Sequence, residues 1–407
     1  MPGILAGRKL LSRRAGEVEE SATLAMTEKA ARLRAQGVDV IAFTAGEPDF
    51  DTPEHIKRAA EEALARGYTK YTAAAGLPAL RKAVAEKFLR DNGLSYDPSQ
   101  IVVSCGAKHS IFNAILAVLD EGDEAIVPAP YWVSYPEMVK CAGARPVIVP
   151  TSEEEGFRLT PQALERAVTA RTKLLILNSP SNPTGGVYTA EELRALAEVA
   201  VRKDFLILSD EIYEKLCFGV PFASIAAAGP EAKDRTIVVN GASKAYAMTG
   251  WRIGYAAGPR EIMAAVARMQ SQSTSNATSI AQYAALAALE GDQSCVEEMR
   301  REYARRRDYV VSRLRRIPGV ACGEPRGAFY VFPKVSALYG RRHRGRRIAG
   351  SVDFSEALLE GARVATVPGA GFGNDAHIRI SYAVSMDKIR EGLDRLERFV
   401  GELDETP

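Results

Sequence analysis

Lys244 lies in a loop of small residues that follows a short apolar run, residues 236–240, and Arg252 comes eight residues later. A strand that ends on such a loop places the lysine amine at the rim of a sheet. An amine there can form a Schiff base with an aldehyde, which is how pyridoxal phosphate is attached to proteins. Arg252 can bind a dianionic phosphate with its forked guanidinium. Taken alone, Lys244 and Arg252 could instead be ordinary surface side chains without a role in cofactor binding.

Two further motifs follow buried-looking runs. Asn182 opens the sequence Asn-Pro-Thr-Gly after residues 173–178, and Asp210 opens Asp-Glu-Ile-Tyr after residues 205–210. In open α/β sheets, ligands bind outside the carboxyl ends of the strands, so one crevice can collect these side chains. A carboxylate beside a protonated pyridine nitrogen favours the charged ring, which is an electron sink. The alternative for Asp210 is the N-cap of a helix that starts at Glu211.

Together, and in this order, the motifs resemble those of the class I (fold-type I) pyridoxal-phosphate-dependent aminotransferases. The likeness extends from about Ser12 to the C-terminus and is closer to the bacterial aspartate/prephenate aminotransferase subgroup. The resemblance implies that Lys244 carries the cofactor and moves the substrate α-proton. It also makes Asp210 the partner of the pyridine nitrogen, with Tyr213 and Asn182 bonded to the ring hydroxyl.

The segment 104–110 joins an expected strand to an expected helix, and the free backbone amides at a helix start suit a phosphate. The resemblance places the cofactor phosphate on the backbone of Gly106 and makes the Arg252 side chain a further phosphate contact. It assigns the remaining cofactor contacts to Ala107, Lys108, Trp132 and Ser243 and, from the neighbouring subunit, to Tyr71. The implied assembly is therefore a homodimer with shared active sites.

Arg379 lies within an otherwise apolar run, residues 377–381, and a buried arginine needs a counter-charge. That charge could come from a carboxylate ligand or from an internal ion pair. The resemblance assigns Arg379 to the substrate α-carboxylate and Lys108 to a distal carboxylate. It adds Gly46, Trp132 and Asn182 to the substrate site; the turn at Gly46 would also let a ligand approach the backbone closely.

The resemblance implies transfer of the amino group of an L-amino acid, aspartate above all, to 2-oxoglutarate, so the partners are small amino acids and 2-oxo acids. Tyrosine, alanine or prephenate as donor, and C–S bond cleavage of a sulfur amino acid, are the alternatives on the same scaffold. Prephenate users in the subgroup share a basic residue before the Ser-Ala-Thr stretch, whereas residues 17–20 are acidic here, which predicts poor use of prephenate. A regulator would need an added DNA-binding domain, and the segment before Ser21 is too short for one.

Composition narrows the class of protein. The chain has 407 residues and a net charge of +2 with both signs mixed. This charge gives no indication that the protein binds nucleic acid. The five cysteines form no Cys-x-x-Cys pair, which indicates neither a disulfide framework nor a metal site and fits a reducing cytoplasm. No apolar run is long enough to cross a bilayer.

Seven short apolar runs alternate with helical patterns, which predicts an α/β fold with a mostly parallel seven-stranded sheet. The runs are residues 101–104, 125–127, 146–149, 173–177, 205–209, 236–239 and 253–257. We expect an N-terminal arm (1–20), a large cofactor-binding domain (48–300), and a smaller α+β domain from 21–47 and 301–407. One helical stretch should join the domains over residues 270–315, and the basic run 341–347 should be a solvated loop.

Overall fold

The computed structural model describes residues 11–404. Its main sheet has seven strands in the order β2-β8-β7-β6-β5-β3-β4, which confirms the predicted mostly parallel sheet. Only β8 runs antiparallel to its neighbours, β2 and β7. The strands are β2 (Ile101–Ser104), β3 (Glu124–Ala129), β4 (Arg145–Pro150), β5 (Thr172–Asn178), β6 (Leu206–Asp210), β7 (Thr236–Gly241) and β8 (Gly254–Ala257).

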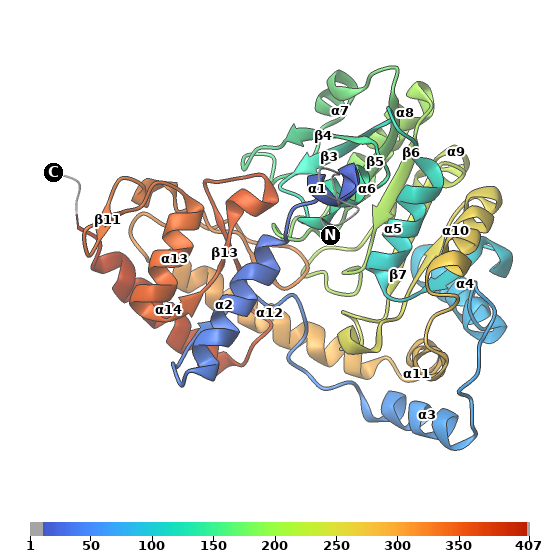
Figure 1. The fold of residues 1–407 in the computed structure, drawn as a ribbon, viewed down its shortest axis with the longest axis horizontal. Coiled ribbons are helices and arrows are strands. Elements are labelled where there is room, and N and C mark those ends of the chain that lie inside the picture. Colours follow the sequence, from blue (N-terminus) through green and yellow to red (C-terminus); the bar gives the residue numbers. More distant parts are fainter. Residues whose placement is uncertain (1–10, 405–407) are drawn as a thin grey trace, which may run out of the picture.

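Alternate residues of these strands pack against helices on opposite faces, which is why the runs are almost continuously apolar. Leu174 and Ile176 of β5 belong to the core formed with α5 (Ala107–Val118), α6 (Ser134–Cys141) and α10 (Arg260–Ser273). Leu175 and Leu177 belong to the core formed with α7 (Pro161–Ala167) and α8 (Ala190–Lys203). The sheet is thus the middle layer of three (Figure 1).

A third apolar cluster joins β2, β7 and β8 to α3 (Glu54–Ala65), α4 (Pro78–Asn92) and α11 (Ser279–Glu290). Helix α4 begins at a proline, which is favoured in the first turn, and ends at Gly93 in the left-handed conformation (φ 67°), a common helix stop. Its C-terminal end lies close to the segment that follows β6, where Lys87 meets Glu214.

The rest of the chain forms a second body with its own core. A three-stranded sheet, β13-β14-β9, packs with α13 (Ser351–Ala362) and α14 (Met386–Gly401); its strands are β9 (Tyr330–Val331), β13 (Val367–Pro368) and β14 (Ile378–Ser381). The N-terminal segment joins this body, because β1 (Ile41–Ala42) pairs with β12 (Val364–Ala365) and α2 (Ala22–Ala35) packs beside it. Figure 1 shows α12 (Ser294–Leu314) running between α11 and this body. The exact domain boundaries stay a prediction.

Two local predictions were wrong. The helical stretch 270–315 is broken into the end of α10, then α11 and α12, because residues 274–278 and 291–293 interrupt it. The basic run 341–347 is not a loop but a hairpin of β10 (Arg342–His343) and β11 (Arg346–Arg347), turned at Gly345 with φ 83°. The N-terminal arm stays a prediction: its described part contains a short helix, α1 (Arg13–Glu17), and residues 1–10 lie outside the described residues.

Within residues 11–404, no helix combines the length and the apolar character needed to cross a bilayer. The five cysteines are free. The same residues contain no group of three or more histidine, cysteine or acidic side chains arranged to hold a metal ion.

Candidate active site

A cavity of about 230 Å³ lies at the carboxyl ends of β5, β6 and β7. Most of the predicted site residues line it together: Gly46, Ala107, Lys108, Trp132, Asn182, Asp210, Tyr213, Ser243, Lys244, Arg252 and Arg379. Gly106 lies beside it, against the Arg252 guanidinium. Tyr71 is not part of the lining and its side chain is 90% exposed. Residues from distant parts of the sequence, such as Gly46 and Arg379, therefore meet in one cavity.

Asp210 is the last residue of β6 and is buried. The Tyr135 hydroxyl donates to Oδ2 at 2.7 Å and the Ile212 amide donates to Oδ1 at 3.2 Å. Burial raises the pKa of this carboxyl to about 6, although both hydrogen bonds oppose the rise. No helix starts at Glu211, where the chain enters a turn, so the N-cap alternative is wrong. A buried carboxylate at the cavity wall fits a cationic ring nitrogen.

Lys244 follows β7 and extends across the cavity. Its Nζ donates to the Gly46 carbonyl at 2.5 Å and lies 6.0 Å from the centre of the Tyr213 ring. Burial lowers the pKa of this amine to about 8, and the Arg252 charge adds to the effect. A fraction of the amine is therefore neutral near physiological pH, as a nucleophile or a general base requires.

In the cofactor-free protein we expect Lys244 to react with an amine-acylating reagent with a midpoint near pH 8, set by its lowered pKa. Exposed lysines should show midpoints near ~10.4. Because the unfolded chain binds this proton more tightly than the folded one, stability should rise as the pH increases across this window. Mass spectrometry of the labelled peptides measures the midpoint, and a value above about pH 10 would contradict the assigned environment.

The start of α5 and the Arg252 side chain form a pocket for an anion. Gly106 caps the helix with φ 92°, and a Cβ added there would lie 2.5 Å from Nη2 of Arg252. Arg252 is held in place by donating from Nη1 to the Thr249 carbonyl at 2.7 Å. Helix-start amides beside a guanidinium suit a phosphate. A side chain at Gly106 would fill this space, so the local geometry fits the predicted phosphate group.

Arg379 is the largest fully buried side chain among the described residues. Nη1 donates to Asn182 Oδ1 at 2.9 Å and Nη2 donates to the Thr44 carbonyl at 2.7 Å, while Nε has no partner. The guanidinium carbon lies 4.5 Å from the centre of the Tyr330 ring. No carboxylate of residues 11–404 forms an ion pair with it, so the internal ion-pair alternative is wrong. A buried, uncompensated cation that lines a cavity is suited to binding a carboxylate.

A second cation faces the same space. Lys108, in the first turn of α5, holds its Nζ 4.8 Å from the centre of the Trp132 ring. Burial lowers the pKa of its ammonium, and the neighbouring Arg252 charge acts in the same direction. Both effects would be offset by an anionic group in the cavity.

Sequence analysis did not identify several residues of the site. Tyr330 shares a 2.8 Å hydrogen bond with the Tyr213 hydroxyl, and Tyr135 bonds Asp210. Asn178 accepts from the Asn182 amide at 2.7 Å and donates to the Asp210 carbonyl at 2.9 Å. Tyr135 lay in a motif that could have identified it, three residues after Trp132. Thr23, in the Ser-Ala-Thr stretch that fits the subgroup, also lines the cavity.

A family model described as "Aminotransferase class I and II" matches residues 38–396. The aspartate aminotransferase of Geobacillus stearothermophilus is 51% identical, over 96% of this chain and 98% of that protein. The aspartate/prephenate aminotransferase of Cereibacter sphaeroides is 52% identical, over 96% and 98%. Among solved structures, the aspartate aminotransferase of Rhizobium meliloti is similar with a TM-score of 0.94 and 46% identity, covering 97% of this chain and 100% of that one. That of Thermus thermophilus with maleate has a TM-score of 0.91 and 49% identity, covering 96% and 100%.

Proposed function

The chain belongs to the class I and II aminotransferase family, and we propose that it transfers the amino group of L-aspartate to 2-oxoglutarate with pyridoxal phosphate as cofactor. It is an aminotransferase by family. The observation that carries the choice of substrate is that two cations, Arg379 and Lys108, line the cavity that also holds Lys244. A dicarboxylate would supply one counter-charge for each of them.

When bound, pyridoxal phosphate supplies an electron sink that stabilises negative charge at the substrate α-carbon. The residues around the cavity fit this group. Gly106 and Arg252 would hold its phosphate, and Trp132 offers an aromatic face. The Asp210 carboxylate would keep the ring nitrogen protonated, and that cation would in turn remove the cost of burying the Asp210 charge.

Lys244 would both attach the cofactor and move the proton. Its Nζ lies between the Gly46 carbonyl and the Tyr213 ring. An amine whose pKa is lowered to about 8 can take a proton from the substrate α-carbon and return it to a nearby atom at neutral pH. Tyr213, with its hydroxyl fixed by Tyr330, would bond the ring oxygen together with Asn182.

Aspartate is favoured because Arg379 can bind an α-carboxylate through two parallel hydrogen bonds, while Lys108 contacts the distal carboxylate as a point charge. The names of the relatives, aspartate and aspartate/prephenate aminotransferase, support the same substrate class. Alanine and tyrosine lack the second carboxylate. With either of them Lys108 would remain unpaired in the cavity.

Lys108→Ala should lower kcat/KM for aspartate by roughly 30-fold or more, since truncating one member of a largely desolvated charge pair costs about 2–5 kcal/mol. The kcat/KM for alanine should change by only a few-fold. Steady-state kinetics with both donors and 2-oxoglutarate measure the difference. Lys82→Ala, a surface lysine on α4, serves as the control. Equal losses for aspartate and alanine would show that Lys108 serves the cofactor or the fold instead.

The proposal includes a homodimer in which Tyr71 of each copy reaches the phosphate site of the other. The segment that carries Tyr71 is held in a defined position although its tip is exposed. Gln282, which is buried, donates to the Thr72 hydroxyl at 3.0 Å, and the buried Gln270 donates to the Ala74 carbonyl at 2.5 Å. An active monomer in sedimentation experiments on dilute protein would overturn this part.

A further inference from the structure

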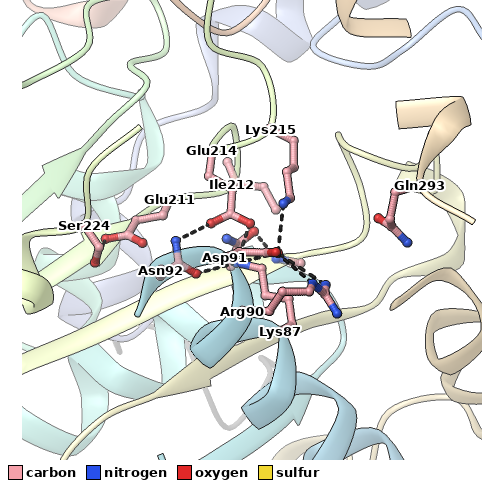
Figure 2. A network of polar contacts seen from close by, with 12 residues as sticks. Lys87, Arg90, Asp91, Asn92, Glu211, Ile212, Glu214, Lys215, Ser224 and Gln293 are labelled. Carbon is pink, nitrogen blue, oxygen red and sulfur yellow. Dashed lines mark hydrogen bonds and ion pairs between the residues drawn. The ribbon is translucent and has the colours of Figure 1, made fainter. Parts of the chain in front are cut away.

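A network of charged side chains lies behind the cavity, where the C-terminal end of α4 meets the turn that follows β6 (Figure 2). Helix α4 contributes Lys87, Asp91 and Asn92, and the turn contributes Glu214 and Lys215. Lys87 is only 2% exposed and Glu214 only 7%. A lysine this deeply buried is rare unless it is paired, so its contacts call for an explanation.

Glu214 is held at both carboxylate oxygens by α4. Lys87 Nζ forms an ion pair with Oε1, and the Asn92 amide donates to Oε2 at 3.0 Å. Lys87 also donates to Asn92 Oδ1 at 2.8 Å, so that Lys87, Asn92 and Glu214 each contact the other two. A second link joins the same two elements, because Lys215 Nζ lies 2.8 Å from Asp91 Oδ2.

The turn that this network holds follows Asp210, the last residue of β6, and carries Tyr213. Asp210 and Tyr213 face the cavity, whereas Glu214 and Lys215 face α4. The backbone of the turn is short and closed, with the Glu214 amide donating to the Glu211 carbonyl at 2.9 Å and the Leu216 amide to the Tyr213 carbonyl at 2.8 Å. Displacing Glu214 must therefore move Tyr213, its neighbour in the chain.

Glu211 adds a third attachment on the same side. It is buried, and its Oε1 accepts from the hydroxyls of Ser209 at 2.9 Å and Ser224 at 2.6 Å. Along residues 210–214, Asp210, Ile212 and Tyr213 therefore line the cavity, whereas Glu211 and Glu214 point into the protein interior. Buried ion pairs often contribute little net stability compared with apolar side chains, but they impose one geometry on the elements that they join.

We propose that Lys87 is a positioning residue: through Glu214 it fixes the turn that presents Tyr213 to the bound cofactor and whose Ile212 amide holds the Asp210 carboxylate. The inference rests on the proposed function of that cavity. It predicts that Lys87 affects cofactor affinity although its side chain lies outside the cavity lining. It also predicts that the substrate-binding cations, Arg379 and Lys108, are unaffected because they lie on other elements.

The test is the dissociation constant of pyridoxal phosphate, measured by titrating cofactor-free full-length protein. Lys87→Met should raise it by about tenfold or more, because it leaves Glu214 buried without its cation and free to shift the turn. The KM for aspartate should stay within about twofold. Lys82→Met is the matched control, since Lys82 lies on the same helix but pairs only with Glu86 at the surface, and it should change neither value.

Lys87→Met combined with Glu214→Gln should recover most of the lost cofactor affinity, because the carboxylate left without its cation becomes a neutral amide. The effects of the two substitutions on the dissociation constant should therefore be clearly non-additive. If Lys87→Met does not fold, Asn92→Ala removes the contact to the second oxygen and should weaken binding by about threefold. Asp210→Asn is measured in parallel as a direct test of the site.

A lowered melting temperature with a dissociation constant equal to that of Lys82→Met would overturn the inference, since Lys87 would then only hold α4. Additive effects of the two substitutions would also overturn it, because Glu214 would not connect Lys87 to the site. If Asp210→Asn weakens binding while Lys87→Met does not, the inference fails and the proposed function stands. If Asp210→Asn has no effect either, the assignment of the cavity itself fails.

Discussion

Lys244→Ala will lower turnover of aspartate by about 10⁴-fold or more, because it removes covalent attachment and proton transfer together. The amine extends into the cavity and donates to the Gly46 carbonyl, and no other lysine combines this position with a pKa lowered to about 8 among the described residues. Loss of deuterium from aspartate labelled at the α-carbon, followed by NMR, measures the proton step. A rate of α-deuterium loss within about tenfold of that of the unmodified protein would contradict the assignment.

The same variant should still bind pyridoxal phosphate. Asp210, Trp132, Arg252 and the start of α5 are separate from the lysine side chain and remain in place. Lys244→Arg is the control for charge, since it keeps a cation in the cavity but cannot form the Schiff base. It should be as inactive as the alanine variant. If activity returns with arginine, the lysine acts only through its charge.

Arg379→Leu should lower kcat/KM by roughly 30- to 4,000-fold for every amino acid donor, because all of them carry the α-carboxylate. The figure follows from about 2–5 kcal/mol for removing one partner of a buried, hydrogen-bonded charge pair. Unlike Lys108→Ala, the loss should not distinguish aspartate from alanine. Steady-state kinetics with both donors provide the comparison.

A second measurement separates binding from folding for this residue. Arg379 is buried without a carboxylate partner, and burying a charge in this way is costly. Arg379→Leu should therefore leave the melting temperature of the ligand-free protein unchanged or raise it. Arg379→Lys keeps the charge but loses the fork, and should retain part of the activity. A clear fall in melting temperature that tracks the loss of activity would indicate that Arg379 holds the fold instead.

The main sheet could be predicted from sequence because both of its faces are covered. Each strand then appears as a nearly continuous apolar run, and all seven runs were correctly placed. Apolar runs at residues 38–43 and 327–332 also predict strands, and β1 and β9 form within them although each has only two residues. The hairpin at residues 342–347 consists of charged residues, so nothing in its composition distinguishes it from a solvated loop.

The residues of the site were predictable where they lay in motifs, and not where they depend on distant contacts. Tyr330 meets Tyr213 from 117 positions away, and its apolar surroundings in the sequence indicate only a core strand. Lys87 likewise resembles any other lysine of a helix until Glu214 is placed beside it. The lack of a carboxylate partner for Arg379 also became evident only from the packing, although the need for a counter-charge was foreseeable.

The central claim, that Lys244 carries pyridoxal phosphate and that aspartate donates to it, is tested most directly by reduction of the cofactor-loaded protein with labelled borohydride. Peptide mapping should place the label on the peptide that contains Lys244. Prior incubation with excess aspartate, without a 2-oxo acid, should abolish most of the label, because the amino group passes to the cofactor and frees the lysine. Label on another lysine, or labelling of Lys244 that aspartate leaves unchanged, would contradict the account.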